Sequence, residues 1–282
     1  MTLFEGEAPR KQKKMKFRLL SIAALALASA FSLVATAETP AVTGIAHVAY
    51  RVANLDVESA FLKKLGYEQS FAITGKDGKV AEIFVKVNDR TFLELYPQTA
   101  ATQPLGWMHI CYEATDMVGY VQAITARGLK PSPVHKAGAG NLITAFNDPD
   151  GRTTEFTQYM PGSKHMLDQG QHLLPNRIAA EVEGVEFGVP DKVASRKFYE
   201  AMGMTVIDEA GGLHVRATAA AHPWIQLAAA DSAPKLVLRV ASLKAAESQL
   251  KKANFTVKKD KKAIFVSDPD GNLFVFAEGE AK

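Results

Sequence analysis

The chain has 282 residues, of which 47% are hydrophobic and 22% are charged. This ordinary globular composition excludes collagen-like and wholly disordered chains, and the length suggests two domains. Cys111 is the only cysteine, which excludes an intramolecular disulfide and cysteine-rich zinc modules. The net charge is +3, but residues 1–37 carry +4 and the remainder carries −1, so the body has no basic excess and we expect no nucleic-acid partner.

The N-terminal segment has the three parts of a secretory signal peptide. Six Lys and Arg residues precede an apolar run from Leu19 to Val34, which ends in Ala35-Thr36-Ala37. Small side chains at these two alanines are typical of a signal peptidase site. The run is shorter than the roughly 20 residues of a membrane span. We therefore expect cleavage after Ala37, no stable membrane anchor after cleavage, and export to the periplasm or the extracellular space.

The rest of the chain contains an internal repeat. The tetrapeptide Asp-Pro-Asp-Gly occurs at 148–151 and at 268–271, and residues 47–67 align without a gap with residues 184–204. Such self-similarity indicates a duplicated domain. The predicted organisation is a signal peptide (1–37), an N-terminal domain (38–160), an aperiodic linker (161–180) and a C-terminal domain (181–282).

Each domain is predicted to repeat a strand–helix–three-strand unit twice. Period-two alternation and short apolar runs predict the strands, and longer segments of helical length predict the helices. For the first unit we expect a strand at 44–52, a helix at 55–65 and strands at 68–74, 79–87 and 91–96. For the second unit we expect a strand at 107–114, a helix at 116–128 and strands near 132–136, 142–147 and 153–159. The C-terminal domain follows the same plan, with helices near 191–202 and 242–253.

Four residues of metal-ligand type occupy equivalent positions in the two units of the first domain. His47 and His109 lie on the first strand of each unit, and Glu94 and Glu155 lie on the last. If a pseudo-two-fold axis relates the units, all four side chains converge. Two neutral imidazoles and two carboxylates suit one divalent ion such as zinc, nickel, cobalt, manganese or iron(II), because two negative charges cancel that of the ion.

Strand alternation predicts further side chains on the same face as these four. We interpret Arg51 as a partner for an anionic substrate group, or else as a surface charge at a strand end. Trp107 and Tyr96 are predicted to wall a substrate pocket, with a place in the core as the alternative. Cys111 is either a fifth ligand or nucleophile, or an inert buried thiol.

The second domain provides an internal control for the four candidates. The matching positions there are Gly184, Gln226, Leu236 and Val275. This set cannot hold a metal ion, so the fold does not require the histidines and glutamates of the first domain. Five other histidines have no symmetric partner and are expected on the surface or in the linker: His135, His165, His172, His214 and His222.

These features resemble the vicinal oxygen chelate (VOC) superfamily, which includes glyoxalase I, fosfomycin and bleomycin resistance proteins, methylmalonyl-CoA epimerase and extradiol dioxygenases. The resemblance covers residues 42–279 and rests on GIAHVAYRV, FLELYP, MHICYEATD and DPDGRTTEF. It implies an α+β fold of two tandem VOC domains, in each of which a pair of βαβββ modules forms an open mixed sheet around a cleft. It also implies a divalent metal ion that chelates adjacent oxygens of a small-molecule substrate. Its ligands would be His47, Glu94, His109 and Glu155.

Within the superfamily, the residue set resembles that of bacterial glyoxalase I. This implies a lyase or isomerase in which Glu155 or Glu94 moves a proton, and the sequence does not separate the two. The runner-up is an extradiol dioxygenase with Fe(II) on His47, His109 and Glu155, although two-domain dioxygenases usually keep their metal in the C-terminal domain. A metal-free, ligand-sequestering protein of the bleomycin-resistance type is the third interpretation. Export argues against glutathione adducts and acyl-CoA as substrates. The sequence leaves open the metal, the substrate, a homodimeric state, and whether the two modules close one site within a chain or between chains.

Overall fold

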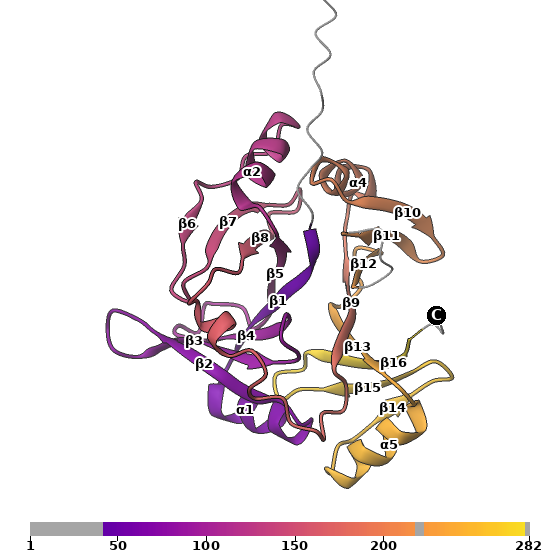
Figure 1. The fold of residues 1–282 in the computed structure, drawn as a ribbon. Coiled ribbons are helices and arrows are strands. Elements are labelled where there is room, and N and C mark those ends of the chain that lie inside the picture. The colour runs from indigo at the N-terminus through magenta and orange to yellow at the C-terminus, as the bar shows by residue number, and fades with distance from the viewer. Residues whose placement is uncertain (1–41, 218–222, 280–282) are drawn as a thin grey trace, which may run out of the picture. The chain divides into compact units, whose positions relative to one another are not determined.

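The computed structural model describes residues 42–217 and 223–279, so the predicted signal peptide lies outside the described residues. The described part of the chain forms two eight-stranded mixed sheets (Figure 1). Both sheets belong to one compact unit that spans residues 37–282. Among the described helices, none has the length and apolar character needed to cross a membrane.

The first sheet has the strand order β2-β3-β4-β1-β5-β8-β7-β6 and carries helices α1 and α2 (Figure 1). Its first half consists of β1 (Val42–Val52), α1 (Leu55–Lys64), β2 (Glu68–Thr74), β3 (Val80–Lys86) and β4 (Phe92–Pro97). Its second half consists of β5 (Gly106–Ala114), α2 (Met117–Ala126), β6 (His135–Lys136), β7 (Leu142–Asn147) and β8 (Thr153–Gln158).

The second sheet repeats this order as β10-β11-β12-β9-β13-β16-β15-β14. Its elements are β9 (Glu181–Gly188), α4 (Lys192–Ala201), β10 (Thr205–Glu209), β11 (Gly212–Arg216), β12 (Trp224–Ala228), β13 (Lys235–Val240), α5 (Leu243–Lys252), β14 (Lys258–Lys259), β15 (Ala263–Ser267) and β16 (Leu273–Glu278). A short helix, α3 (Lys164–Leu167), lies between the two sheets in the chain. The predicted α+β class and the tandem pair of open mixed sheets are confirmed.

The two Asp-Pro-Asp-Gly segments form the same turn. Oδ1 of Asp148 accepts hydrogen bonds from the backbone N–H groups of Asp150 and Arg152, at 2.9 and 2.8 Å. Asp268 forms the equivalent pair of bonds in the second turn. The glycines that end the motifs have φ of +81° and +90°, a conformation that costs other residues more. The repeated tetrapeptide thus marks one structural feature used twice.

Strand pairing in the first sheet brings the predicted site strands together. β1 pairs in parallel with β4 and antiparallel with β5, and β5 pairs in parallel with β8. The four strands that carry the candidate ligands are therefore adjacent at the centre of the sheet. One face contributes Tyr50, Tyr112 and Phe156 to a hydrophobic core that continues to Phe187 and Phe274 of the second sheet. The opposite face is left for the polar cluster.

Candidate metal centre

The strand register arranges the candidate ligands in two rows across neighbouring strands. The first row contains Glu94, Ala49 and His109. The second row contains His47, Cys111 and Glu155. Because side chains two residues apart on a strand share a face, the rows present their polar groups on the same side of the sheet. Both modules of this cluster belong to one chain and pair through β1 and β5.

The four predicted side chains converge on Nε2 of His47. This atom lies 3.1 Å from Nε2 of His109, 3.1 Å from Oε2 of Glu94 and 3.5 Å from Oε1 of Glu155. Nε2 of His109 lies 3.2 Å from the same Oε2 of Glu94. The side chains of these two histidines and of Glu94 are less than a tenth exposed, and that of Glu155 is 17% exposed.

These spacings fit a metal ion. Two donor atoms that each lie about 2.1 Å from one ion stand roughly 3.0 to 3.4 Å apart for right-angled to tetrahedral geometry. The buried Oε2 of Glu94 also forms no hydrogen bond of ordinary geometry with the described residues, which suits an atom that faces an ion. Within the described residues, two groups place three donor atoms within 4.8 Å of one another. They are His47, Glu94 and His109, and His47, Cys111 and Glu155.

In the metal-free protein, the side chains of this cluster shift the pKa values of His47 and Glu94. Burial lowers the pKa of His47, but the carboxylates of Glu94 and Glu155 outweigh it, so the pKa lies above its ordinary value. Burial raises the pKa of Glu94, but the imidazoles of His47 and His109 outweigh it, so this pKa lies well below its ordinary value. A metal ion would therefore displace a proton from the imidazole, because histidine binds metals in its neutral form.

Cys111 lies in the row of His47 and Glu155 and is fully buried. Burial, followed by the charges of Glu155 and Glu94, raises the pKa of the Cys111 thiol well above its ordinary value. A protonated thiol is a poor nucleophile and a poor metal ligand. In the metal-free protein the inert buried thiol is therefore the better interpretation of this residue.

A cavity of about 300 Å³ opens in front of the cluster. It includes three of the predicted ligands and Tyr96, as the sequence suggested. The remaining side chains come mostly from β3, the segment around β6, β7 and α3. The lining residues are His47, Glu82, Phe84, Glu94, Tyr96, His135, Lys136, Ala137, Gly138, Ala139, Asn141, Ile143, Glu155, Thr157 and His165.

Glu82 is a third carboxyl group in this cavity that sequence reasoning missed. Burial, followed by a hydrogen bond to Glu94, raises the pKa of Glu82 to about 7. The pKa of Tyr96 is also raised, by burial and by the charges of Glu94 and Glu82, so its hydroxyl group stays protonated. Strand alternation could have revealed Glu82. It lies two residues from Phe84 and so shares its face, and Phe84 pairs with Glu94 on the neighbouring strand.

The prediction that Trp107 shares the face of His109 is wrong. A register shift between Ala49 and Tyr50 inserts Met108 as an extra residue in β5, so Trp107 pairs with Tyr50. Their ring centroids lie 4.7 Å apart. A one-residue shift of this kind moves a side chain to the opposite face of the sheet.

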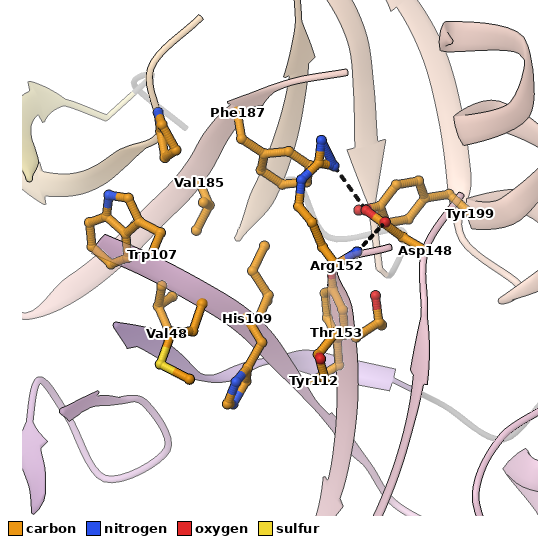
Figure 2. Close-up of a pocket in the computed structure, with 14 residues that line it drawn as sticks. Val48, Trp107, His109, Tyr112, Asp148, Arg152, Thr153, Val185, Phe187 and Tyr199 are labelled. Carbon is orange, nitrogen blue, oxygen red and sulfur yellow. Dashed lines mark hydrogen bonds and ion pairs between the residues drawn. The ribbon is translucent and has the colours of Figure 1, made fainter. Parts of the chain in front are cut away.

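Trp107 instead lines a second cavity of about 140 Å³, which also receives Val185, Phe187 and Tyr199 from the second domain (Figure 2). The imidazole of His109 points away from these side chains. Arg51 lines neither cavity, and its Nη1 donates a hydrogen bond to the carbonyl oxygen of Pro104 at 3.0 Å.

The second sheet carries a different set at the matching positions. The register places Lys235 where the first sheet has His109, so the alignment to Leu236 is wrong by one residue. Leu236 lies fully buried in the core, whereas Lys235 forms an ion pair with Glu186. Gly184 replaces His47, and a Cβ atom there would lie 2.4 Å from the ring of Trp224. Among the described residues of this sheet, no group of metal ligands is found.

Comparison with known families identifies the first domain. Residues 39–146 match the family described as the Glyoxalase/Bleomycin resistance protein/Dioxygenase superfamily. This segment is a VOC domain. No curated protein matches the chain.

Several solved structures share the tandem VOC fold. A Mn(II)-bound glyoxalase from Novosphingobium aromaticivorans matches with a TM-score of 0.65 at 18% identity, over 85% of this chain and 83% of the other. A catechol 2,3-dioxygenase matches with a TM-score of 0.64 at 14% identity, over 85% and 88%. The 2,3-dioxygenase LapB from Pseudomonas sp. KL28 matches with a TM-score of 0.63 at 15% identity, over 86% and 93%. At these identities the likeness concerns the fold.

Proposed function

We propose that this protein is an exported, metal-dependent VOC enzyme, most similar in its chemistry to a glyoxalase-like lyase or isomerase. The observation that carries the proposal is the convergence of two imidazoles and two carboxylates on one buried point, with donor spacings of 3.1 to 3.5 Å. When bound there, a divalent ion would supply Lewis-acid polarisation of two adjacent substrate oxygens. The substrate is a small molecule that fits the cavity of about 300 Å³.

A difference in exposure between the two glutamates supports separate roles for them. Glu94 is 5% exposed in its side chain and lies within 3.2 Å of both imidazoles, so it is held as a fixed ligand. Glu155 is 17% exposed and lies 3.5 Å from His47. Because a general base must reach the proton that it removes, the less constrained Glu155 takes up the substrate proton and later returns it. Tyr96 and Phe84 help to exclude water from this exchange.

Elemental analysis of the mature protein, residues 38–282, purified anaerobically without chelator, tests the proposal. We expect about one metal ion per chain. The double substitution His47→Ala and His109→Ala should remove the ion, whereas His214→Ala in the second sheet should retain it. Nickel, zinc, cobalt or manganese would support a lyase or isomerase. A protein that takes up no metal even after reconstitution would overturn the proposal and leave a ligand-sequestering protein.

An Fe(II) extradiol-type dioxygenase is the second candidate. Two histidines and one carboxylate suit non-haem iron oxygenases. In this interpretation His47 and His109 supply the imidazoles, and Glu155, 3.5 Å from His47, supplies the carboxylate. Two of the similar structures are also dioxygenases. Oxygen uptake by the iron-loaded protein in the presence of catechol would favour this candidate. Its absence, with iron bound, would exclude catechol ring cleavage.

We also propose that the protein is exported, which rests on the N-terminal sequence alone. Expression of the full chain with its own N-terminus in a Gram-negative host, followed by osmotic shock, tests this. We expect the periplasmic fraction to contain a product that begins at Glu38. A cytoplasmic product that retains residues 1–37 would refute export.

A further inference from the structure

His165 is a buried histidine in the candidate metal cavity that no repeat symmetry predicted. It lies on α3, in the segment expected to be a simple linker, and it is only 3% exposed. It lines the same cavity as His47, Glu94 and Glu155. His165 lies in the predicted linker, as expected, but it is buried there, and its place in the cavity requires a physical reason.

The segment that carries His165 is anchored to the first sheet. Lys86 of β3 is fully buried and forms ion pairs with Asp89 at 2.7 Å and with Asp168 at 2.9 Å, just after α3. Asp89 also accepts a hydrogen bond from the backbone N–H of Gly170 at 2.8 Å. Because a buried ammonium is costly unless it is paired, these contacts hold the segment in one position.

The hydrogen-bond network fixes the tautomer of His165. Oδ1 of Asn141 accepts a hydrogen bond from the backbone N–H of Met160 at 3.1 Å, which orients the amide. Nδ2 of Asn141 therefore faces Nδ1 of His165, at 2.9 Å. An amide nitrogen can only donate, so Nδ1 of His165 accepts and the ring hydrogen lies on Nε2.

This Nε2–H group has no hydrogen-bond partner among the described residues. The ring packs edge-on against Phe71, Phe84 and Phe92, with centroid distances of 4.7 to 4.9 Å. Burial, followed by the nearby charge of His47, lowers the pKa of His165 to about 3, so the ring stays neutral near pH 7. A buried donor without an acceptor lowers stability, and such groups in a cavity mark a place for a ligand atom.

We propose that the Nε2–H of His165 is a substrate-binding donor that receives an oxygen acceptor of the substrate, beyond the two adjacent oxygens that bind the metal. This inference rests on the proposed function, because it concerns the same cavity. It assigns the substrate a third oxygen. A site that provides a buried donor also discriminates against analogues that lack the acceptor, since the donor is then left unpaired.

The tautomer is tested by long-range ¹H–¹⁵N NMR of the metal-free mature protein near pH 7. We expect one histidine with a protonated Nε2 and an unprotonated Nδ1 whose signals are missing in His165→Gln. Substitution of Asn141 by Ala should shift the Nδ1 resonance of that ring. Protonation of Nδ1 in the unsubstituted protein would overturn the proposal, because Nε2 would then be an acceptor.

Substrate binding is tested on the zinc-loaded protein with 4-nitrocatechol, which has two adjacent oxygens and a nitro group as a further acceptor. We expect His165→Ala to weaken probe binding about tenfold while the zinc affinity stays unchanged, and His165→Gln, which retains an N–H donor, to recover part of the loss. His214→Ala, in the second sheet, serves as the control. Equal probe affinity in His165→Ala with zinc bound would refute this inference alone, whereas failure of the unsubstituted protein to bind zinc would refute the proposed function as well.

Discussion

The two sheets of this protein share a backbone plan and differ in what they carry at its centre. Both have the same strand order and the same Asp-Pro-Asp-Gly turn. The first sheet gathers two imidazoles and two carboxylates there, whereas the second has an ion pair between Lys235 and Glu186. The difference shows that the fold does not need the polar cluster, and that the cluster is a feature of the first sheet's side chains.

The second sheet also leaves no room for a ligand side chain at the position of His47. At the position of His47 it has Gly184, and the ring of Trp224 occupies the space where a side chain would begin. Restoring one ligand would therefore not restore a metal site, because the backbone of β9 and the indole ring would first have to separate. The second sheet therefore differs from the first in shape as well as in ligand chemistry.

The largest expected effect is on metal affinity, when the first sheet receives the lysine that the second sheet has at the matching position. His109→Lys replaces a ligand with a cation, and we expect metal affinity to fall more than about 100-fold, as measured by chelator competition. The reciprocal change Lys235→His should create no metal site, since Gln226 and Val275 supply no charged ligand. Metal retention in His109→Lys would contradict the four-ligand arrangement.

The next comparison separates the two glutamates of the first sheet. Glu155→Gln should lower turnover of a confirmed substrate by about 10²–10⁴-fold while most of the metal affinity remains, because it removes the proton carrier. Glu94→Gln should instead weaken metal binding. Measurement of kcat beside a metal titration distinguishes these outcomes. A dioxygenase that uses only Glu155 as its carboxylate ligand would barely respond to Glu94→Gln.

A third comparison concerns helices α1 and α4, which carry Glu58 and Ser195 at equivalent buried positions. Burial, followed by the charges of Asp268 and Asp270, raises the pKa of Glu58 to about 8. The folded state then binds this proton more tightly than the unfolded chain does. The free energy of unfolding therefore falls as the pH rises from about 4.5 to about 8.

We expect Glu58→Gln to remove this fall. The variant should match the unsubstituted protein near pH 5 and exceed its stability by roughly 2–4 kcal/mol at pH 9. Urea unfolding at several pH values measures the difference. Ser195→Ala should leave the slope unchanged, and an unchanged slope in Glu58→Gln would show that this carboxyl group ionises at its ordinary pH.

The smallest effect is expected at the two turns. Asp270 accepts a hydrogen bond from the backbone N–H of Ala53 at 2.8 Å. The equivalent of Ala53 in the second repeat is Pro190, which has no N–H, and there Arg152 donates to the carbonyl oxygen of Gly188 instead. We expect Asp270→Ala to lower the free energy of unfolding by about 1–2 kcal/mol. Asp270→Asn, which keeps an acceptor, should lose less in the same urea experiment.

The sequence predicted the repeat, the fold class and the convergence of four side chains, because strand period and internal symmetry indicate all three. The four side chains are those of His47, Glu94, His109 and Glu155. Trp107 was assigned to the wrong face because an inserted residue in a strand leaves no mark on the alternation of apolar residues. Leu236 was aligned one residue out of register because the apolar stretch Leu236–Leu238 shows no alternation that would reveal which side chain faces the cluster. His165 was missed because it lies outside both repeats, and tertiary contacts alone bring it to the cavity.

The anchoring of α3 by Lys86 has a consequence for where this protein can be divided. A chain cut at residue 160, where the repeat ends, would keep the four candidate ligands and lose one wall of the cavity together with Asp168, a partner of the buried ammonium. The repeated segment is thus shorter than the segment that forms the complete cavity. A fragment of the first domain that keeps this cavity wall and the partners of Lys86 has to extend past Gly170.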